Sequence, residues 1–404
     1  MAQQHLDPTD PVTGSKPGPT TGPTTGPVSA EALAVYLRDQ ATEFLRALRL
    51  HREAGAGAAS GDSVEAALAL RRSARRISGS LHTFQAVLDP GWSEAMRPEL
   101  AWVSGTLALE HACSARLERL LQALYRLSGT ATLPAQGAAG TGPAGGAARS
   151  SAPAAVAARG DTASLATGTG SIGAGTTTPE RGSLTVGAAK AGALLDRQLT
   201  LARTRAHSTA LQALGSSRFH AVADKVAVLA SEVPLVPGAG AADLRPPAEA
   251  ARERLADAVA ALPLLTAGSP YNAEALVHGL SPDLAPHPQD APWHQVRLLL
   301  RLHRYAREAL HHTAADADGS TSVPASTAAT PPPDVRLLAT GEALDRHRDA
   351  SEAAAAAAHA ARTPRIAPAT AYALGVLHAD QRHEVEAARY AFQRGWHKDV
   401  LGSP

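Results

Sequence analysis

The chain has 404 residues, of which 44% are hydrophobic and only 3% aromatic, with 38 Lys and Arg against 37 Asp and Glu. Alanine, the best helix former, supplies much of the hydrophobic content, and the β-branched and aromatic runs typical of strands are almost absent, so the composition favours an all-α protein. The nearly balanced charge excludes a global field that attracts polyanions, so any anion recognition has to come from local clusters.

The sequence also limits the kinds of site and the location. Cys113 is the only cysteine, which excludes a disulfide scaffold and a multi-cysteine metal site, and its apolar helical context predicts a small buried side chain. The N-terminal segment lacks the basic and apolar regions of a signal peptide, and no uncharged apolar run approaches the roughly 20 residues of a membrane span. We therefore expect a cytoplasmic protein with no membrane attachment, no metal and no cofactor.

The first part of the chain alternates between helical and low-bulk composition. Residues 1–28 are rich in Pro, Thr and Gly and predict a disordered tail. Residues 29–128 predict a first helical half, with Ser29 as the N-cap of its first helix. Pro98 is expected to kink or split the last helix of this half near its start. Residues 129–187, composed of Gly, Ala, Ser, Thr and Pro, predict a flexible linker.

Residues 188–404 predict a second helical half. Gly215 and Ser216 are expected to stop one helix and restart another, and residues 314–333 predict a spacer rich in Pro, Thr, Ser and Ala. Two final helices are expected at about 335–361 and 368–400. The chain is thus predicted to contain two helical bundles of about four helices each.

One stretch, WHQVRLLLRLHRYAREAL at 293–310, places cations at steps of three, four and three. On a helix these steps bring four side chains onto one face. The face consists of His294, Arg297, Arg301 and Arg304. An apolar stripe of Leu298, Leu299, Leu302, Ala306 and Ala309 is expected to enter the core beside it. Glu308 is the only acid in the stretch, so the pattern indicates an anion site, with a solvated basic face as the alternative.

Two further basic clusters accompany this stretch. Their members are Arg71, Arg72, Arg75 and Arg76 on a helix of the first half, and Arg203 and Arg205 in the sequence LARTRAHS. Arginine suits oxyanions because its planar guanidinium donates two parallel hydrogen bonds to phosphate oxygens and stays charged. An ordinary solvated basic face remains the alternative for both clusters.

Enzymatic activity is not expected. The sequence has no Gly-rich phosphate loop, nucleophile elbow or HExxH motif. The segment EVEAAR at 384–389 contains an acidic pair that we interpret as surface. Sequence-specific nucleic-acid binding is not expected either, because the few aromatic residues are assigned to the core and leave no base-stacking platform.

Several segments together resemble the conserved-histidine α-helical domain, or CHAD, family. Residues 293–305 resemble the second copy of its basic helix, and residues 68–84 resemble the first copy. Residues 84–107, FQAVLDPGWSEAMRPELAWVSGTL, are similar to the family's F-x-x-L-L-D-P-x-W-x-x-x-L-R-x-E-L-x-W-L-x-x-x-L. DRHRDA at 345–350 and LGVLHAD at 374–380 resemble turns and helices near the family's C-terminus, and through them His347 and His378 match family positions.

The resemblance implies a CHAD-type domain of two pseudo-symmetric antiparallel bundles whose basic helices line a groove between the halves. It also implies non-enzymatic binding of inorganic polyphosphate or a related polyanion there, with association with polyphosphate granules and any protein partner left open. In the first copy Leu68 takes the place of the family's histidine and Ser78 that of its last arginine. The alternative is therefore a degenerate helical scaffold that mediates protein–protein interaction with little polyanion affinity.

Overall fold

The structure, a computed structural model, describes residues 28–55, 60–129, 179–264, 266–269, 273–280, 287–318 and 333–396. Within these ranges the chain is helical almost throughout and has no β-strand, apart from an isolated bridge between Leu88 and Leu235. The predicted all-α class is confirmed. Almost all of the predicted tail, and most of the predicted linker and spacer, lie outside the described residues.

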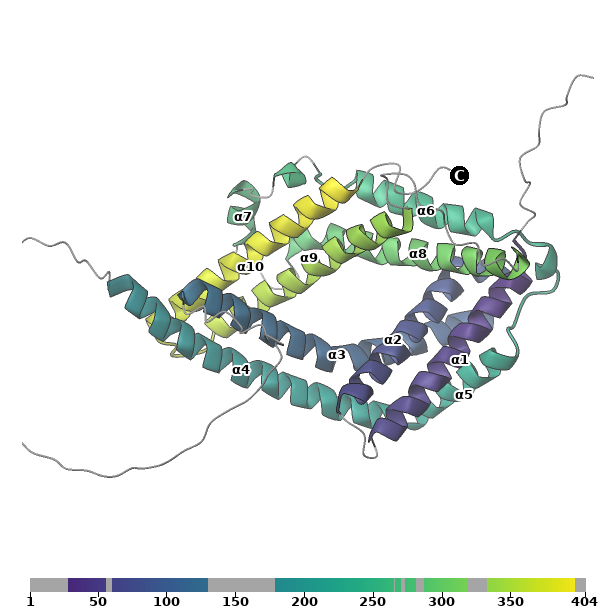
Figure 1. The fold of residues 1–404 in the computed structure, drawn as a ribbon, viewed down its shortest axis with the longest axis horizontal. Coiled ribbons are helices and arrows are strands. Elements are labelled where there is room, and N and C mark those ends of the chain that lie inside the picture. Colours follow the sequence, from purple (N-terminus) through teal and green to yellow (C-terminus); the bar gives the residue numbers. More distant parts are fainter. Residues whose placement is uncertain are drawn as a thin grey trace, which may run out of the picture. The chain divides into compact units, whose positions relative to one another are not determined.

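The helices follow one another with few other elements between them (Figure 1). In chain order they are α1 (Ala30–Gly55), α2 (Ser60–Thr83), η1 (Gln85–Val87), α3 (Pro90–Ser128), α4 (Pro179–Leu214), α5 (Ser217–Ser231), η2 (Ala239–Ala241), α6 (Arg245–Ala260), η3 (Thr266–Gly268), α7 (Ala273–Gly279), η4 (Pro288–Asp290), α8 (Ala291–Asp318), α9 (Pro333–Ala361) and α10 (Pro368–Gly395).

Proline marks the first residue of α3, α4, α9 and α10. This position favours proline because its fixed φ suits a helix and the N–H that it lacks has no partner there. The helical start at Pro179 lies inside the predicted linker, and α8 continues to Asp318, inside the predicted spacer. The helix α3 also runs on through Pro98, so the predicted split is wrong. One missing backbone hydrogen bond is outweighed there by the packing of the rest of the long helix.

Side chains cap two of the helix starts. The Asp89 carboxylate accepts a hydrogen bond from the backbone N–H of Trp92 at 2.7 Å, and the Ser216 hydroxyl accepts one from the N–H of Phe219 at 3.2 Å. Such caps satisfy donors that the first helical turn leaves open. The stop and restart expected at Gly215 and Ser216 is confirmed.

The chain forms two compact units. Unit 1 contains the described residues of 1–108, 210–261 and 295–332, and unit 2 contains those of 109–209, 262–294 and 333–404. The units do not coincide with the predicted first and second halves, because each takes helices from both sides of the predicted linker.

Unit 1 is built on the helical hairpin of α1 and α2, with α5 packed along α1 (Figure 1). Its core contains large side chains that are fully buried, among them Phe44, Phe84 and Phe219. The helix α2 also approaches α8 very closely at Gly79, where a Cβ atom would lie only 2.6 Å from Cδ2 of Tyr305. Glycine is therefore required for this contact.

Unit 2 is built on the hairpin of α9 and α10 (Figure 1). Its core brings small residues of α9 against Leu374 and Leu377 of α10, and the α9 residues are Ala353, Ala357 and Ala360. Alanine allows two helix backbones to pack close together, which explains how a chain poor in aromatic residues fills its interior. Cys113 is buried and is a free thiol, as predicted.

Candidate functional site

The basic residues of α2 divide into two faces. Arg72 pairs with Glu65, with Nη1 and Oε1 3.3 Å apart, and Arg76 donates from Nε to both carboxylate oxygens of Glu308, at 2.9 and 3.1 Å. Arg71 and Arg75, four residues apart, share another face and are half-buried. The structure thus gives Arg72 and Arg76 acidic partners and brings Arg71 and Arg75 together.

The basic face of α8 borders the core of unit 1. Val296, Leu300 and His303 are buried, while Leu298 is 48% exposed. The predicted apolar stripe was wrong for Leu298, Leu299 and Leu302, and right for Ala306 and Ala309. The buried positions each precede a cation by one residue, so Arg297, Arg301 and Arg304 are half-buried at the edge of the core.

The positive charges of Arg71, Arg297 and Arg301 all act on Arg75. Burial, followed by the positive charges of Arg71 and Arg301 and then of Arg297, lowers the pKa of the Arg75 guanidinium to about 9, while Tyr305 acts in the opposite direction. The Arg75 Nε donates a hydrogen bond to the hydroxyl of Ser104 at 2.9 Å, which fixes its direction. A concentration of positive charge of this kind favours a bound anion.

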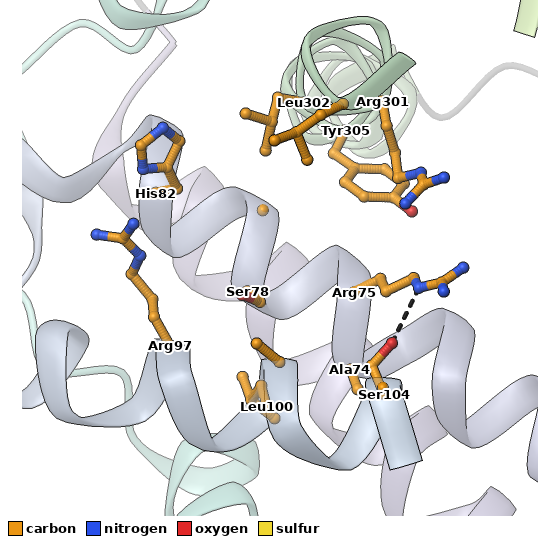
Figure 2. Close-up of a pocket in the computed structure, with 14 residues that line it drawn as sticks. Ala74, Arg75, Ser78, His82, Arg97, Leu100, Ser104, Arg301, Leu302 and Tyr305 are labelled. Atoms are coloured by element: carbon orange, nitrogen blue, oxygen red, sulfur yellow. Dashed lines mark hydrogen bonds between the residues drawn. The ribbon is translucent and has the colours of Figure 1, made fainter. Parts of the chain in front are cut away.

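A cavity of about 420 Å³ lies beside this cluster, between α2, α3 and α8 within unit 1. Figure 2 shows Arg75, Arg301 and Tyr305 at one end of it. Its polar lining consists of arginine, histidine, serine and tyrosine side chains, and none of its described lining residues is acidic. In addition, neither Arg301 nor Arg304 forms an ion pair with any carboxylate in the described part of the chain.

His82 and Arg97 lie at the other end of the cavity (Figure 2). Burial, then the charges of Arg97 and Arg254, lower the pKa of the His82 imidazole below its ordinary value. Its Nδ1 atom is buried and accepts or donates no hydrogen bond among the described residues. Sequence reasoning missed this pair, because no spacing rule connects a histidine on α2 with an arginine on α3.

His347 belongs to a buried ionic network in unit 2. Asp290 is fully buried and pairs with Arg382 at 2.8 Å and with Arg389 at 2.6 Å, and the His347 Nε2 lies 3.6 Å from its carboxylate. The serine hydroxyl of Ser351 also donates to Asp290. Hydrogen bonds and charge from Arg382 outweigh burial and hold the pKa of Asp290 well below its usual range. Burial and Arg389 lower the pKa of His347 well below its ordinary value.

The remaining predicted residues of unit 2 are not gathered into one cluster. His294 is half-buried, with its ring centroid 5.5 Å from that of His347. The Nδ1 of His378 lies 3.0 Å from the carbonyl oxygen of Ala354. Arg203 and Arg205 are exposed on α4.

The acidic pair in EVEAAR also divides. Glu384 is half-buried and lies 3.7 Å from Arg119 and 3.9 Å from Arg126, but Glu386 is buried and pairs with Arg389 at 2.7 Å. The interpretation of both acids as surface residues was therefore wrong for Glu386, whose pKa burial raises. Its partner Arg389 comes one helical turn later, at a spacing that sequence alone could have flagged.

The described residues contain no group of three or more His, Cys, Asp or Glu side chains able to hold a metal ion. None of their helices has both the length and the apolar character that a membrane crossing requires.

Comparison with known proteins identifies the family. The model of the CHAD domain matches residues 39–323, more than half of the chain. The chain belongs to the CHAD family. It is also similar to the solved structure of PptA from Streptomyces chartreusis, with 61% sequence identity, a TM-score of 0.66, and coverage of 92% of this chain and 99% of that one. Comparison with curated proteins gives no significant match.

The CHAD match contains both basic helices, α2 and α8, and ends before α9 and α10, which carry His347 and His378. Ser78, which takes the place of an arginine of the family pattern, lines the cavity of unit 1. Leu68, in the place of the family histidine, is half-buried on α2.

Proposed function

We propose that this CHAD chain binds inorganic polyphosphate, or a closely related polyanion, without catalysing a reaction on it. Family membership supports polyphosphate-related binding in general. We propose that the site lies at Arg75, because Arg71, Arg297 and Arg301 bring positive charge to it beside a cavity whose described lining has no carboxylate. We call these four residues the arginine cluster.

The physical argument is one of charge balance. Repulsion among the guanidinium groups raises the free energy of the empty cluster, and it is strongest at the half-buried Arg75 because burial weakens screening by water. A phosphate chain supplies a negative charge at each repeat and offers oxygen pairs that match the arginine fork. Single exposed ion pairs contribute only about 0–1 kcal/mol, so affinity arises from several contacts on one polymer.

Other predicted residues take different places in this proposal. Arg304 extends the same face of α8 and is proposed as a further contact. His294, Arg203 and Arg205 remain candidate contacts in unit 2. Arg72, Arg76, His347 and His378 have protein partners, and we assign them structural roles.

The test compares binding of long-chain polyphosphate by the full native chain and by the double variant Arg75→Gln with Arg301→Gln. Losing charged hydrogen bonds of about 1.5–3 kcal/mol each predicts at least roughly tenfold weaker binding. The control is Arg46→Gln with Arg49→Gln, which removes the same charge from exposed pairs on α1 of the same unit and should bind normally.

Three results would contradict the proposal. The first is no saturable binding by the native chain at low salt. The second is an equal loss in the two double variants, which would indicate a general charge effect. The third is binding of duplex DNA as tight as that of polyphosphate at equal phosphate concentration, which would indicate capture of any polyanion.

A further inference from the structure

The cavity of unit 1 has basic groups at two separate ends. Arg75 and Arg301 lie at one end, and His82 and Arg97 lie at the other (Figure 2). Arg75 and His82 are seven residues apart on α2, so the rise of the helix separates them by about 10 Å. The two ends can therefore hold two separate anionic groups.

The middle of the cavity is apolar. Leu100 of α3 and Leu302 of α8 face this space from opposite sides, beside the ring of Tyr305 (Figure 2), and Gly79 is a further lining residue. Inorganic polyphosphate carries charge along its whole length and has no apolar part, so it gains nothing from these side chains. A volume of about 420 Å³ is, in contrast, within the usual range for small-molecule pockets.

The end of the cavity at His82 contains a buried polar atom that no described residue satisfies. The buried Nδ1 of His82 has no hydrogen-bond partner among the described residues, although buried polar atoms normally have one. Arg97 and the exposed Arg254 bring positive charge to the same imidazole. A phosphate oxygen here would neutralise this charge and would stabilise the protonated, hydrogen-bonding form of the ring.

We propose that the cavity binds a small organic molecule that carries phosphate groups at two separate positions on a body with an apolar ring. One phosphate lies against Arg75 and Arg301, the other against His82 and Arg97, and the body packs between Leu100 and Leu302. This goes beyond the proposed function, although it shares Arg75 and Arg301 with it.

The probe for the test is adenosine 3′,5′-bisphosphate, measured by calorimetry on the full chain. ADP has the same body and the same number of phosphates but carries both on one side, and pyrophosphate has no body. The bisphosphate is expected to bind at least about tenfold more tightly than either, because it alone reaches both basic ends and covers the apolar wall. Equal affinity for the bisphosphate and ADP, or for the bisphosphate and pyrophosphate, would overturn the proposal.

Two variants locate the binding. Gly105 lines the cavity, and a Cβ atom there would meet no other atom within 4 Å, so Gly105→Leu adds bulk to the cavity without a clash. Gly375→Leu is the matched control, an equally open and exposed helical glycine in unit 2. We expect Gly105→Leu to weaken bisphosphate binding at least about tenfold and the control to leave it unchanged. Unchanged binding in Gly105→Leu would overturn the proposal.

Arg97→Gln tests the end of the cavity at His82. It should reduce bisphosphate affinity to the level of ADP while leaving the affinity for ADP itself unchanged. Binding of long-chain polyphosphate without any binding of the bisphosphate would overturn the inference and leave the proposed function intact. Binding of the bisphosphate without any binding of polyphosphate would overturn the proposed function and leave this inference intact.

Discussion

The protonation of His347 depends on four groups around it. Arg389 donates from Nε to the His347 Nε2 at 3.3 Å, and Trp293 stacks on its ring with centroids 5.6 Å apart. Arg389, His294 and Arg382 all disfavour a proton on the ring, and Asp290 is the one charge that favours it. Because burial adds to the first effect, the neutral imidazole is the stable form in the folded protein.

This environment predicts a pH dependence of stability. The pKa of His347 is lowered in the folded state, so below about pH 6.5 only the unfolded chain takes up the proton. The contribution of His347 to the free energy of unfolding is fully present above that pH. Below it, this contribution falls by up to about 1.4 kcal/mol for each pH unit. Urea unfolding of native protein and His347→Gln at pH 7.5, 6.5 and 5.5 should show a stability difference that narrows toward acid. A difference that stays constant would contradict this assignment.

The sequence pattern pointed to the residues of the arginine cluster, but it did not predict the ionic network around Asp290. Helical spacing relates Arg297 to Arg301 directly, because both lie on one element. Asp290 and its partners Arg382 and Arg389 lie on elements about 90 residues apart, and nothing local links them. For the same reason His347 matched a family position and was assigned to the ligand, although in the structure it contacts a buried carboxylate.

At the scale of the helix, starts and stops were predictable where proline, serine or glycine marks them. Which face of α8 is buried could not be predicted in this way. Leucines follow one another at 298–300, so the sequence allows more than one apolar stripe, and in the structure Leu300 is buried while Leu298 is exposed. At Gly79 the ring of Tyr305 from α8 lies against the backbone of α2.

The close contact predicts an unusual response to Gly79→Ala. Alanine normally stabilises a helix interior by up to about 1 kcal/mol relative to glycine. At Gly79 the new Cβ would displace the Tyr305 ring, at an overpacking cost of about 1–3 kcal/mol. Urea unfolding should therefore find Gly79→Ala less stable than Gly105→Ala, whose Cβ meets open space. Equal stabilisation by both substitutions would show that Tyr305 gives way freely.

At the scale of the whole molecule, a net charge of +1 gives no strong overall positive field, so the arginine cluster attracts anions only locally. Ionic strength should then act on polyphosphate binding through the few phosphates in contact. By analogy with single-stranded nucleic acids, about four contacts predict a slope of roughly −3 for log affinity against log salt.

Titration of polyphosphate at several NaCl concentrations measures this slope. Arg75→Gln with Arg301→Gln should make it shallower by about one to two, whereas Arg46→Gln with Arg49→Gln should leave it unchanged. A native slope close to zero would mean that contacts other than charge hold the ligand.

The assembly of unit 1 from three separate stretches has a consequence for synthesis on the ribosome. Its core needs Ala306 and Ala309 of α8 as well as the hairpin of α1 and α2. The N-terminal hairpin therefore leaves the ribosome long before its last partners are translated, and its apolar face stays uncovered for that time. Unit 2 likewise cannot close before α9 and α10 emerge. A nascent chain stalled near residue 260 should consequently be a substrate for chaperones, whereas one released in full should not.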